Sequence, residues 1–353
     1  MSLDSGDALL SVNNIRTQFA TPGGALTAVD GVSFTLERGK AIGIVGESGS
    51  GKSVLSRSIM RLLPKTNVRS TGDVTFDGVD LMSLRPKELR AMWGPEISMV
   101  FQDPLGSLNP VMRIGDQVGE GLRVHLGMSK KEARATALML LRDVGIPEPE
   151  RRLDEYPHQL SGGMRQRIVI AIAIACGPKL LIADEPTTAL DVTVQAQILD
   201  LLKRQQEDRD MSMILITHDL GVVAGRTDEI IVMYAGRVVE RAPTATLFSE
   251  MRHPYTEALL RSIPKIEYAS HTRLDTIPGR PPDMVHPPKG CKFAARCRYA
   301  QDRCIEEEPQ LTEGESPGHV YRCFFPVGTP EGADALARNV ASGKAEEIAV
   351  DIS

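Results

Sequence analysis

A glycine-rich run that ends in Lys-Ser is the part of the sequence with the clearest chemical potential. The letters G-E-S-G-S-G-K-S occupy residues 46–53 and follow the apolar stretch Ala41–Val45. Glycines at this spacing let backbone N–H groups turn toward a phosphate, and a helix that begins at the loop favours negative charge there. We therefore predict that Lys52 contacts the β- and γ-phosphates of a nucleotide and that the Ser53 hydroxyl binds Mg²⁺. The predicted nucleotide-binding loop consists of Gly46, Glu47, Ser48, Gly49, Ser50, Gly51, Lys52 and Ser53.

A second apolar stretch, Leu180–Ala183, is followed by the adjacent carboxylates of Asp184 and Glu185. Side chains that follow one another in a strand point to opposite faces, so the two acids are predicted to do different work. We expect Asp184 to hold Mg²⁺ through water and Glu185 to polarise an attacking water as general base. The alternative is a pair of solvent-exposed charges at a strand end, and the glycine-rich loop upstream argues against it.

Three single residues carry weaker signals. His218 follows the β-like run Met213–Thr217, where a structural histidine is the ordinary explanation. Gln102, in M-V-F-Q-D-P, indicates little by itself. Phe19 lies upstream of the glycine-rich loop and is our candidate for stacking on adenine, against the alternative of an ordinary core phenylalanine.

Four of the five cysteines fall in the last quarter of the chain, with the spacing C-x5-C-x6-C-x18-C. This spacing matches neither the short C-x2–4-C pairs of zinc sites nor the usual ferredoxin runs. Four soft thiolates with no interleaved histidine favour an iron–sulfur cluster or an all-thiolate zinc site, and unligated buried thiols remain the alternative. The candidate metal ligands are Cys291, Cys297, Cys304 and Cys323.

The first three of these cysteines lie among many basic residues and only one acid, Asp302. Positive charge would offset an anionic metal–thiolate centre, and it is predicted to lower the pKa of the thiols. The basic residues are Lys289, Lys292, Arg296, Arg298 and Arg303. The fifth cysteine, Cys176, lies in an apolar run and is predicted to be a small buried hydrophobic residue.

Composition places the chain among soluble globular proteins. At 353 residues it exceeds one typical domain of about 100–200 residues, so one large domain with an appendage is expected. A net charge of -5 argues against a general role in binding nucleic acid. Residues 1–10 carry two acids and no base, so no secretory signal is expected. The longest apolar run, Ile168–Cys176, falls far short of the roughly 20 residues that span a bilayer, so any membrane contact should be peripheral.

The elements that must position these residues can be outlined from the pattern. Residues 41–45, 180–183 and 213–217 are expected to be buried strands, and Ser53–Leu63 has the spacing of a helix. Helix-like segments fill residues 103–157. Five prolines between Pro278 and Pro288 predict a stiff linker.

The run L-S-G-G-M-R-Q-R at residues 160–167 lies between the loop and the carboxylates. By itself it predicts a helix start with Ser161 as N-cap. Together, the three motifs resemble the ATPase subunit of an ATP-binding cassette (ABC) transporter, and the resemblance extends over about residues 8–327. It implies that this signature run contacts the γ-phosphate of a nucleotide held by another subunit. The signature residues are Ser161, Gly162, Gly163 and Gln166.

The resemblance also gives roles to the weaker candidates. It implies that His218 is the switch histidine at the γ-phosphate and that Phe19 is the aromatic residue that stacks on adenine. Gln102 resembles the glutamine that joins the magnesium site to the helical subdomain, so the implied Mg²⁺ ligands are Ser53, Gln102 and Asp184. Asp191, in T-A-L-D, resembles the D-loop that crosses the dimer interface.

Three further segments resemble the peptide and nickel importer branch of the family. They are F-Q-D-P-L-G-S-L-N-P at 101–110, H-P-Y-T at 253–256 and G-C-K-F-A-A-R-C-R-Y-A-Q-D-R-C at 290–304. Dipeptide importer ATPases that resemble this last segment carry a 4Fe–4S cluster there, so the resemblance implies such a cluster on the four cysteines.

The implied fold is α/β, a RecA-like P-loop ATPase core with an N-terminal antiparallel β portion, an inserted helical subdomain and a small C-terminal extension with the cysteines. The expected ATPase domain covers 8–250, with the helical subdomain at about 103–157. The extension is expected over 251–327. Residues 328–353 show no periodic apolar face and are expected to form a loosely held tail.

The resemblance implies ATP hydrolysis that energises import of di- or oligopeptides from the cytoplasmic face of the membrane. Nickel, glutathione or other small solutes are alternative cargoes, and a soluble ABC ATPase of DNA repair or translation is the alternative class. Because the sequence holds one loop and one signature, a second ATPase subunit is required, and we expect a different chain, so that the pair is a heterodimer. Two transmembrane permeases and an extracytoplasmic binding protein are the other implied partners, and no nucleic acid.

Overall fold

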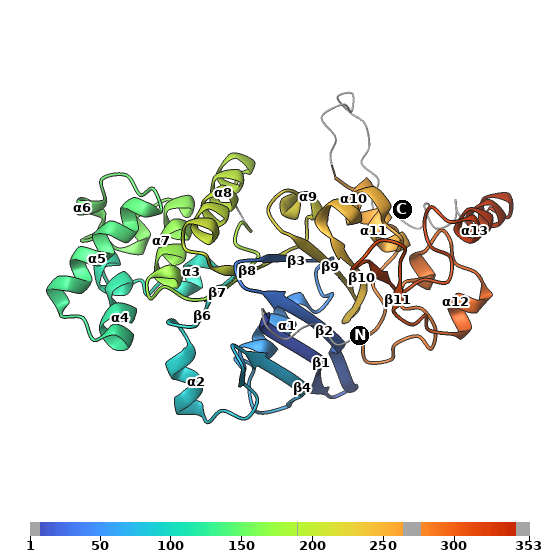
Figure 1. Cartoon of the computed structure of the whole chain (residues 1–353), viewed down its shortest axis with the longest axis horizontal. Helices are drawn as coiled ribbons and strands as arrows, with labels where there is room; N and C mark the ends of the chain where they lie inside the picture. Colours follow the sequence, from blue (N-terminus) through green and yellow to red (C-terminus); the bar gives the residue numbers. More distant parts are fainter. Residues whose placement is uncertain (1–7, 189, 264–276, 344–353) are drawn as a thin grey trace. The chain divides into compact units, whose positions relative to one another are not determined.

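The computed structural model describes residues 8–188, 190–263 and 277–343 (Figure 1). The chain forms two compact units, which are described separately. The first unit contains the chain up to Leu10, Thr35–Ala41 and Thr75–Ile216. The second contains Ser11–Phe34, Ile42–Val74 and the chain from Thr217 onward. The C-terminal extension belongs to the second unit together with the loop at 46–53, and the expected domain boundary at 250 stays a prediction.

Three parallel strands form the centre of the first unit: β6 (Ile97–Val100), β7 (Leu180–Asp184) and β8 (Ser212–Thr217). Ile97 pairs with Leu180, and Leu180 pairs with Ser212. Every residue of β7 and β8 is buried. Strands that are buried on both faces are continuous apolar runs, and this pattern predicted β7 and β8 from the sequence. The short β5 (Val79–Asp80) pairs with the end of β4 (Val68–Phe76).

The first unit also contains the expected helical segment, in which α4 (Ile114–Leu126), α5 (Lys130–Asp143) and α6 (Pro149–Arg152) lie together (Figure 1). Ser129 starts α5 by accepting a hydrogen bond from the Glu132 N–H, while the Glu132 carboxylate accepts one from the Ser129 N–H. The apolar face of α5 buries Ala133, Ala137, Leu140 and Leu141. The helices of this unit are α2 (Pro86–Met92), α3 (Pro104–Ser107), α4 (Ile114–Leu126), α5 (Lys130–Asp143), α6 (Pro149–Arg152), the 3-10 helix η1 (Pro157–Gln159), α7 (Gly162–Ile174) and α8 (Val192–Asp208).

The second unit contains the N-terminal β portion and most of a mixed sheet. A two-residue turn joins β1 (Ala8–Thr21) to β2 (Gly24–Glu37), which makes the pair an antiparallel hairpin, and β4 lies on the other side of β1. In the mixed sheet, β3 (Ala41–Val45) is parallel to β9 (Glu229–Tyr234). Antiparallel neighbours then follow in the order β10 (Arg237–Pro243), β12 (Val320–Tyr321) and β11 (Thr312–Glu313).

The helices of the second unit are α1 (Lys52–Ile59), α9 (Leu220–Val223), α10 (Thr244–Glu250), α11 (Pro254–Arg261), the 3-10 helix η2 (Ala294–Arg296), α12 (Asp302–Glu306) and α13 (Pro330–Ala341). Helix α1 ends four residues before the expected Leu63, and Arg61 just beyond it has a φ of 53°. A residue in this left-handed region ends a helix.

Part of the expected C-terminal tail is a helix instead. Thr329 caps α13 through its hydroxyl, and Pro330 occupies the first position. Ala335 and Asn339 are buried one turn apart, and the Asn339 amide donates to the Arg298 and Ala300 carbonyls. Because small and polar residues make this contact, the sequence shows no apolar periodicity that would predict the helix. The remainder of the expected tail, 344–353, lies outside the described residues.

Candidate active site

The glycine-rich loop, in the second unit, has a conformation that needs its glycines. Gly51 has a φ of 102°, and a Cβ built on it would lie 2.3 Å from the Ala28 carbonyl oxygen. A Cβ on Gly46 would lie 2.2 Å from the Met233 carbonyl oxygen. Gly49 has a φ of 81° and open space around it. Two of the three glycines are therefore required by close backbone approach, and Gly49 by its backbone conformation.

Lys52 folds back into this loop. Its Nζ donates to the Gly46 carbonyl at 2.7 Å and to the Glu47 carbonyl at 3.0 Å, and the side chain is 4% exposed. Carbonyl oxygens carry partial negative charge, so they occupy positions around the ammonium that phosphate oxygens could take. Lys52 is also the first residue of α1, whose N-terminus favours an anion.

The two carboxylates at the end of β7 lie in the first unit and have different environments. Asp184 is fully buried, whereas Glu185 is 9% exposed. The Oε2 atom of Glu185 accepts hydrogen bonds from Gln102 Nε2 at 2.9 Å and from Thr188 Oγ1 at 3.0 Å. The structure thus brings together two predicted residues, Gln102 and Glu185. The sequence placed Thr188 only in the D-loop run T-A-L-D, and its contact with Glu185, three residues earlier, was not expected.

The signature run forms the start of α7, also in the first unit. As predicted, Ser161 is the N-cap, and its hydroxyl accepts a hydrogen bond from the Met164 N–H at 3.4 Å. Ser161 and Gly162 are exposed. Asp191 caps α8 by accepting a hydrogen bond from the Val194 N–H at 3.0 Å. A Cβ on Gly163 would lie 2.9 Å from Val194 Cγ1, so the glycine allows α7 and α8 to approach.

Gln166 is the buried residue of the signature, and its contact with a partner's nucleotide stays a prediction. It is 1% exposed and lies on the inner face of α7, unlike Ser161 and Gly162 at the helix start. The reason is helical geometry, because a residue five positions after Ser161 points away from the exposed helix start. Its amide has no hydrogen-bond partner among the described residues.

The other candidates lie in the second unit with the loop. His218 is exposed directly after Thr217, and the Thr217 hydroxyl accepts a hydrogen bond from the Asp219 N–H at 3.1 Å. Phe19 is half-buried on β1. The predicted site residues are therefore divided between the units, with Gln102, Asp184, Glu185 and the signature in the first.

Comparison with known proteins identifies the family. The chain is 48% identical over 340 residues to the oligopeptide transport ATP-binding protein OppD of Bacillus subtilis, covering 95% of each chain. It is 51% identical over 320 residues to the dipeptide transport ATP-binding protein DppD of Bacillus subtilis, covering 90% of this chain and 95% of that one. The ABC transporter family model matches residues 29–188. The chain belongs to the ABC transporter ATPase family.

Solved structures agree with this assignment. The dimeric ATP-binding cassette MJ0796, in a post-hydrolysis state with ADP and phosphate, is 30% identical to this ABC subunit, with a TM-score of 0.60. The match covers 67% of this chain and 98% of that cassette. A second family model, described as the C-terminal region of oligopeptide and dipeptide transporters, matches residues 239–304. Among the described residues, no helix has the length and apolarity needed to cross a membrane.

In this ABC subunit the H-P-Y-T segment, residues 253–256, contacts the glycine-rich loop at 46–53, which is called the phosphate loop below. His253 caps α11, its Nδ1 accepting a hydrogen bond from the Tyr255 N–H at 3.1 Å, and burial lowers the pKa of His253 to about 4. Tyr255 is fully buried, and its hydroxyl accepts a hydrogen bond from the Glu47 N–H at 2.7 Å. Arg296 forms an ion pair with the Glu47 carboxylate at 2.6 Å. Neither contact was predictable from the sequence, because no spacing pattern links residues so distant in the chain.

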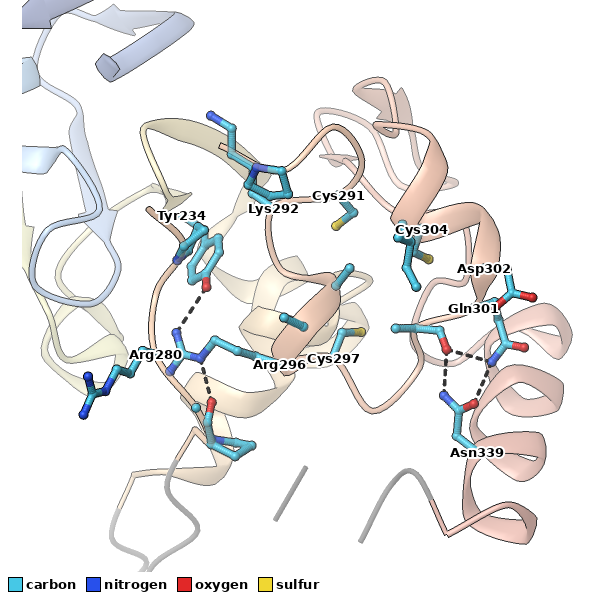
Figure 2. A pocket seen from close by; sticks show the side chains of 18 of the residues that line it. Tyr234, Arg280, Cys291, Lys292, Arg296, Cys297, Gln301, Asp302, Cys304 and Asn339 are labelled. Atoms are coloured by element: carbon cyan, nitrogen blue, oxygen red, sulfur yellow. Dashed lines mark hydrogen bonds between the residues drawn. The ribbon is translucent and has the colours of Figure 1, made fainter. Parts of the chain in front are cut away.

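The four C-terminal cysteines line one small cavity together with Phe293 and Phe325. Cys291, Cys297 and Cys304 also line a second, larger pocket, to which Arg280 and Arg296 contribute and which Figure 2 shows. Within residues 8–188, 190–263 and 277–343, however, no group of three or more His, Cys, Asp or Glu side chains has an arrangement that could hold a metal ion. The predicted metal site is therefore not confirmed by the geometry.

The prediction of lowered thiol pKa values is wrong. Burial raises the pKa of Cys291 to about 11 and that of Cys297 well above its usual range. Burial likewise raises the pKa of Cys304 and of Cys323. Desolvation dominates because the nearby cations have other partners: Lys292 pairs with Asp30, Arg296 with Glu47, and Arg303 stacks on the Phe324 ring. Cys176, expected to be buried, is only partly so.

Proposed function

We propose that this chain is the ATP-hydrolysing subunit of an ABC importer that takes up di- or oligopeptides. The observation that carries the proposal is that one chain combines the ABC region with the C-terminal region of oligopeptide and dipeptide transporters. Its relatives of 48–51% identity are named as peptide transport ATP-binding proteins. Nickel, glutathione and other small solutes are the alternative cargoes.

In the proposed reaction the chain's own groups bind ATP and activate water. Lys52 exchanges its carbonyl partners for phosphate oxygens, and Phe19 stacks on adenine. Glu185, oriented by Gln102 and Thr188, accepts a proton from the attacking water. His218 contacts the γ-phosphate.

The residues proposed to hold Mg²⁺ are Ser53, Gln102 and Asp184. Hydroxyl, amide and carboxylate oxygens are the donors that Mg²⁺ prefers, and the fully buried carboxylate of Asp184 provides negative charge for a cation. When bound, Mg²⁺ neutralises charge on the phosphate oxygens.

We propose that each active site is completed by a second ATPase subunit, in a heterodimer. The exposed Ser161 and Gly162 at the start of α7 support this, since a helix N-terminus with exposed N–H groups suits a phosphate. The dimeric state named for the similar cassette MJ0796 also supports it. Two permeases and an extracytoplasmic binding protein are the remaining proposed partners, with this subunit peripheral on the cytoplasmic face of the membrane.

Uptake by the purified complex tests the proposal. The chain is co-purified with its permeases, reconstituted in vesicles with the binding protein, and supplied with labelled di- and oligopeptides, nickel or glutathione. ATP-dependent accumulation of peptides alone is expected. Accumulation of another solute instead of peptides would reassign the cargo, and purification without any permease would favour a soluble ABC ATPase.

We also propose that the four cysteines hold a 4Fe–4S cluster. The support is chemical, because the four thiols line the same cavity and thiolates are the usual ligands of such clusters. The thiols must approach one another to bind it, since the described residues hold no ready-made ligand group. Iron and visible absorbance after anaerobic purification are expected, and both should fall in Cys297→Ser. Colourless, iron-free protein excludes the cluster, and bound zinc indicates an all-thiolate zinc site.

A further inference from the structure

Glu47 places a negative charge on the loop that is proposed to bind the phosphates of ATP. Its carboxylate is clamped by the guanidinium of Arg296, with Nη1 donating to Oε2 at 2.6 Å and Nη2 donating to Oε1 at 2.9 Å. This bidentate arrangement is the strong form of an arginine–carboxylate pair. The Tyr255 hydroxyl holds the backbone of the same residue by accepting from the Glu47 N–H.

The guanidinium of Arg296 is itself fixed by three further hydrogen bonds. Its Nε donates to the Pro278 carbonyl at 2.7 Å and its Nη2 to the Ile277 carbonyl at 3.2 Å. Its Nη1 donates to the Tyr234 hydroxyl at 3.2 Å (Figure 2). With the two bonds to Glu47, all five N–H donors of the guanidinium have acceptors. The side chain is 3% exposed, so the charge of Arg296 is balanced by Glu47 rather than by water.

Three aromatic rings lie next to the ion pair between Arg296 and Glu47. Tyr234 of β9, Tyr255 of α11 and Phe293 next to η2 pack against one another, with ring centroids 4.6 to 5.3 Å apart. The rings join the core sheet to the cysteine segment. Arg296 is the last residue of η2, a turn in which the Ala294 N–H donates to the Cys291 carbonyl and the Cys297 N–H donates to the Ala294 carbonyl.

We propose that Arg296 is a positioning residue for ATP binding, through which the cysteine segment 291–297 controls the charge and shape of the phosphate loop. An unpaired Glu47 carboxylate would repel the phosphates, and Arg296 neutralises it while fixing the first turn of the loop. This inference rests on the proposed function as an ATP-binding subunit.

Substitution of Arg296 by Met tests the proposal. The dissociation constant for a fluorescent ATP analogue is measured on the purified full chain, and KM and kcat for ATP on the reconstituted complex. Arg296→Met is expected to raise Kd and KM about tenfold, a typical coupling factor, with kcat changed less than about twofold. Adding Glu47→Gln removes the unpaired charge and should restore most of the affinity. The matched control is Arg280→Met, which removes an exposed arginine from the larger pocket that Arg296 also lines and should change neither constant.

The rescue distinguishes positioning from a merely structural role, because loss of packing would not be repaired by Glu47→Gln. Unchanged Kd in a folded Arg296→Met chain, or no rescue by the second substitution, overturns the proposal. If Arg296→Met does not fold, Arg296→Lys replaces it. Arg296→Lys should also raise Kd for ATP, by a smaller factor, and adding Glu47→Gln should again restore most of the affinity. Absence of ATP binding in the unsubstituted chain would refute the proposed function instead.

Discussion

At the scale of single residues, Glu185 is the most informative position. It leaves β7 with a φ of 46°, a left-handed conformation that costs a non-glycine residue about 1–3 kcal/mol. The surrounding structure maintains it through the bond from the Glu185 N–H to the Ile216 carbonyl at 2.9 Å and the side-chain bonds from Gln102 and Thr188. The bend aims the carboxylate at Gln102, which an extended strand end would not ensure.

Glu185→Gln is expected to retain ATP binding and lose turnover by about 10²- to 10⁴-fold, the usual contribution of a general base. The amide keeps the size of the side chain and an acceptor for Gln102, but it cannot take a proton from water. ATP binding and phosphate release are measured on the same preparation. Hydrolysis at the rate of the unsubstituted protein would refute the general-base assignment.

At the scale of elements, the signature and the D-loop are positioned by one contact between helices. The Cβ that Gly163 lacks would lie 2.9 Å from Val194 Cγ1, so the starts of α7 and α8 are packed without a spare methyl group. Ser161 and Asp191 cap these two helices with their side chains. The residues proposed to face another subunit therefore depend on the packing between α7 and α8.

Gly163→Ala should displace the start of α7 and lower ATPase activity of the dimer severalfold, while ATP binding by the phosphate loop persists. Val194→Ala removes the opposing methyl group, so the double variant should recover much of the lost activity. ATPase rate and ATP affinity are measured for both variants. Equal activity in all forms would show that this contact does not position the signature.

The cap of α11 predicts a pH dependence of stability. Burial lowers the pKa of His253 to about 4 in the folded chain, below its usual value near 6.5, so the unfolded chain binds more protons between these values. Stability is therefore expected to fall as the pH drops from 6.5 to 4. His253→Asn keeps an acceptor for the Tyr255 N–H and should flatten this part of the profile. Thermal unfolding across the pH range is the measurement, and parallel profiles for both proteins would contradict the assignment.

At the scale of the whole molecule, the chain is proposed to hold two halves of different active sites. The loop at 46–53 is proposed to bind the chain's own nucleotide, and the exposed start of α7 is proposed to meet a partner's nucleotide. On this proposal a complete site requires assembly, and hydrolysis is a property of the dimer.

Ser161→Arg in one subunit of the assembled pair is expected to stop hydrolysis at the partner's nucleotide while that subunit still binds ATP in its own loop. The long cation replaces a hydroxyl at the helix start and blocks the approach of the γ-phosphate. Nucleotide trapping with differently tagged subunits reports which of the two sites no longer hydrolyses ATP. Loss confined to the substituted subunit's own loop would contradict a site shared between chains.

Much of the fold followed from local pattern. Buried parallel strands such as β7 and β8 are continuous apolar runs, and the helix cap Ser161 was predicted from a few residues. Helix α13 was missed because its buried face consists of small and polar residues. The thiol pKa values were wrongly predicted because proximity in sequence does not show where a cation's partner lies.

The sequence by itself determined the phosphate loop, the strand-end carboxylates and the signature, since each depends on residue types at short fixed spacing. Only the tertiary structure decided which side chains these residues meet. It placed Gln102 and Thr188 on Glu185, buried Gln166, and brought Tyr255 and Arg296 to Glu47. Contacts between residues some 200 positions apart leave no periodicity in the chain, because they are selected by the packing of whole elements.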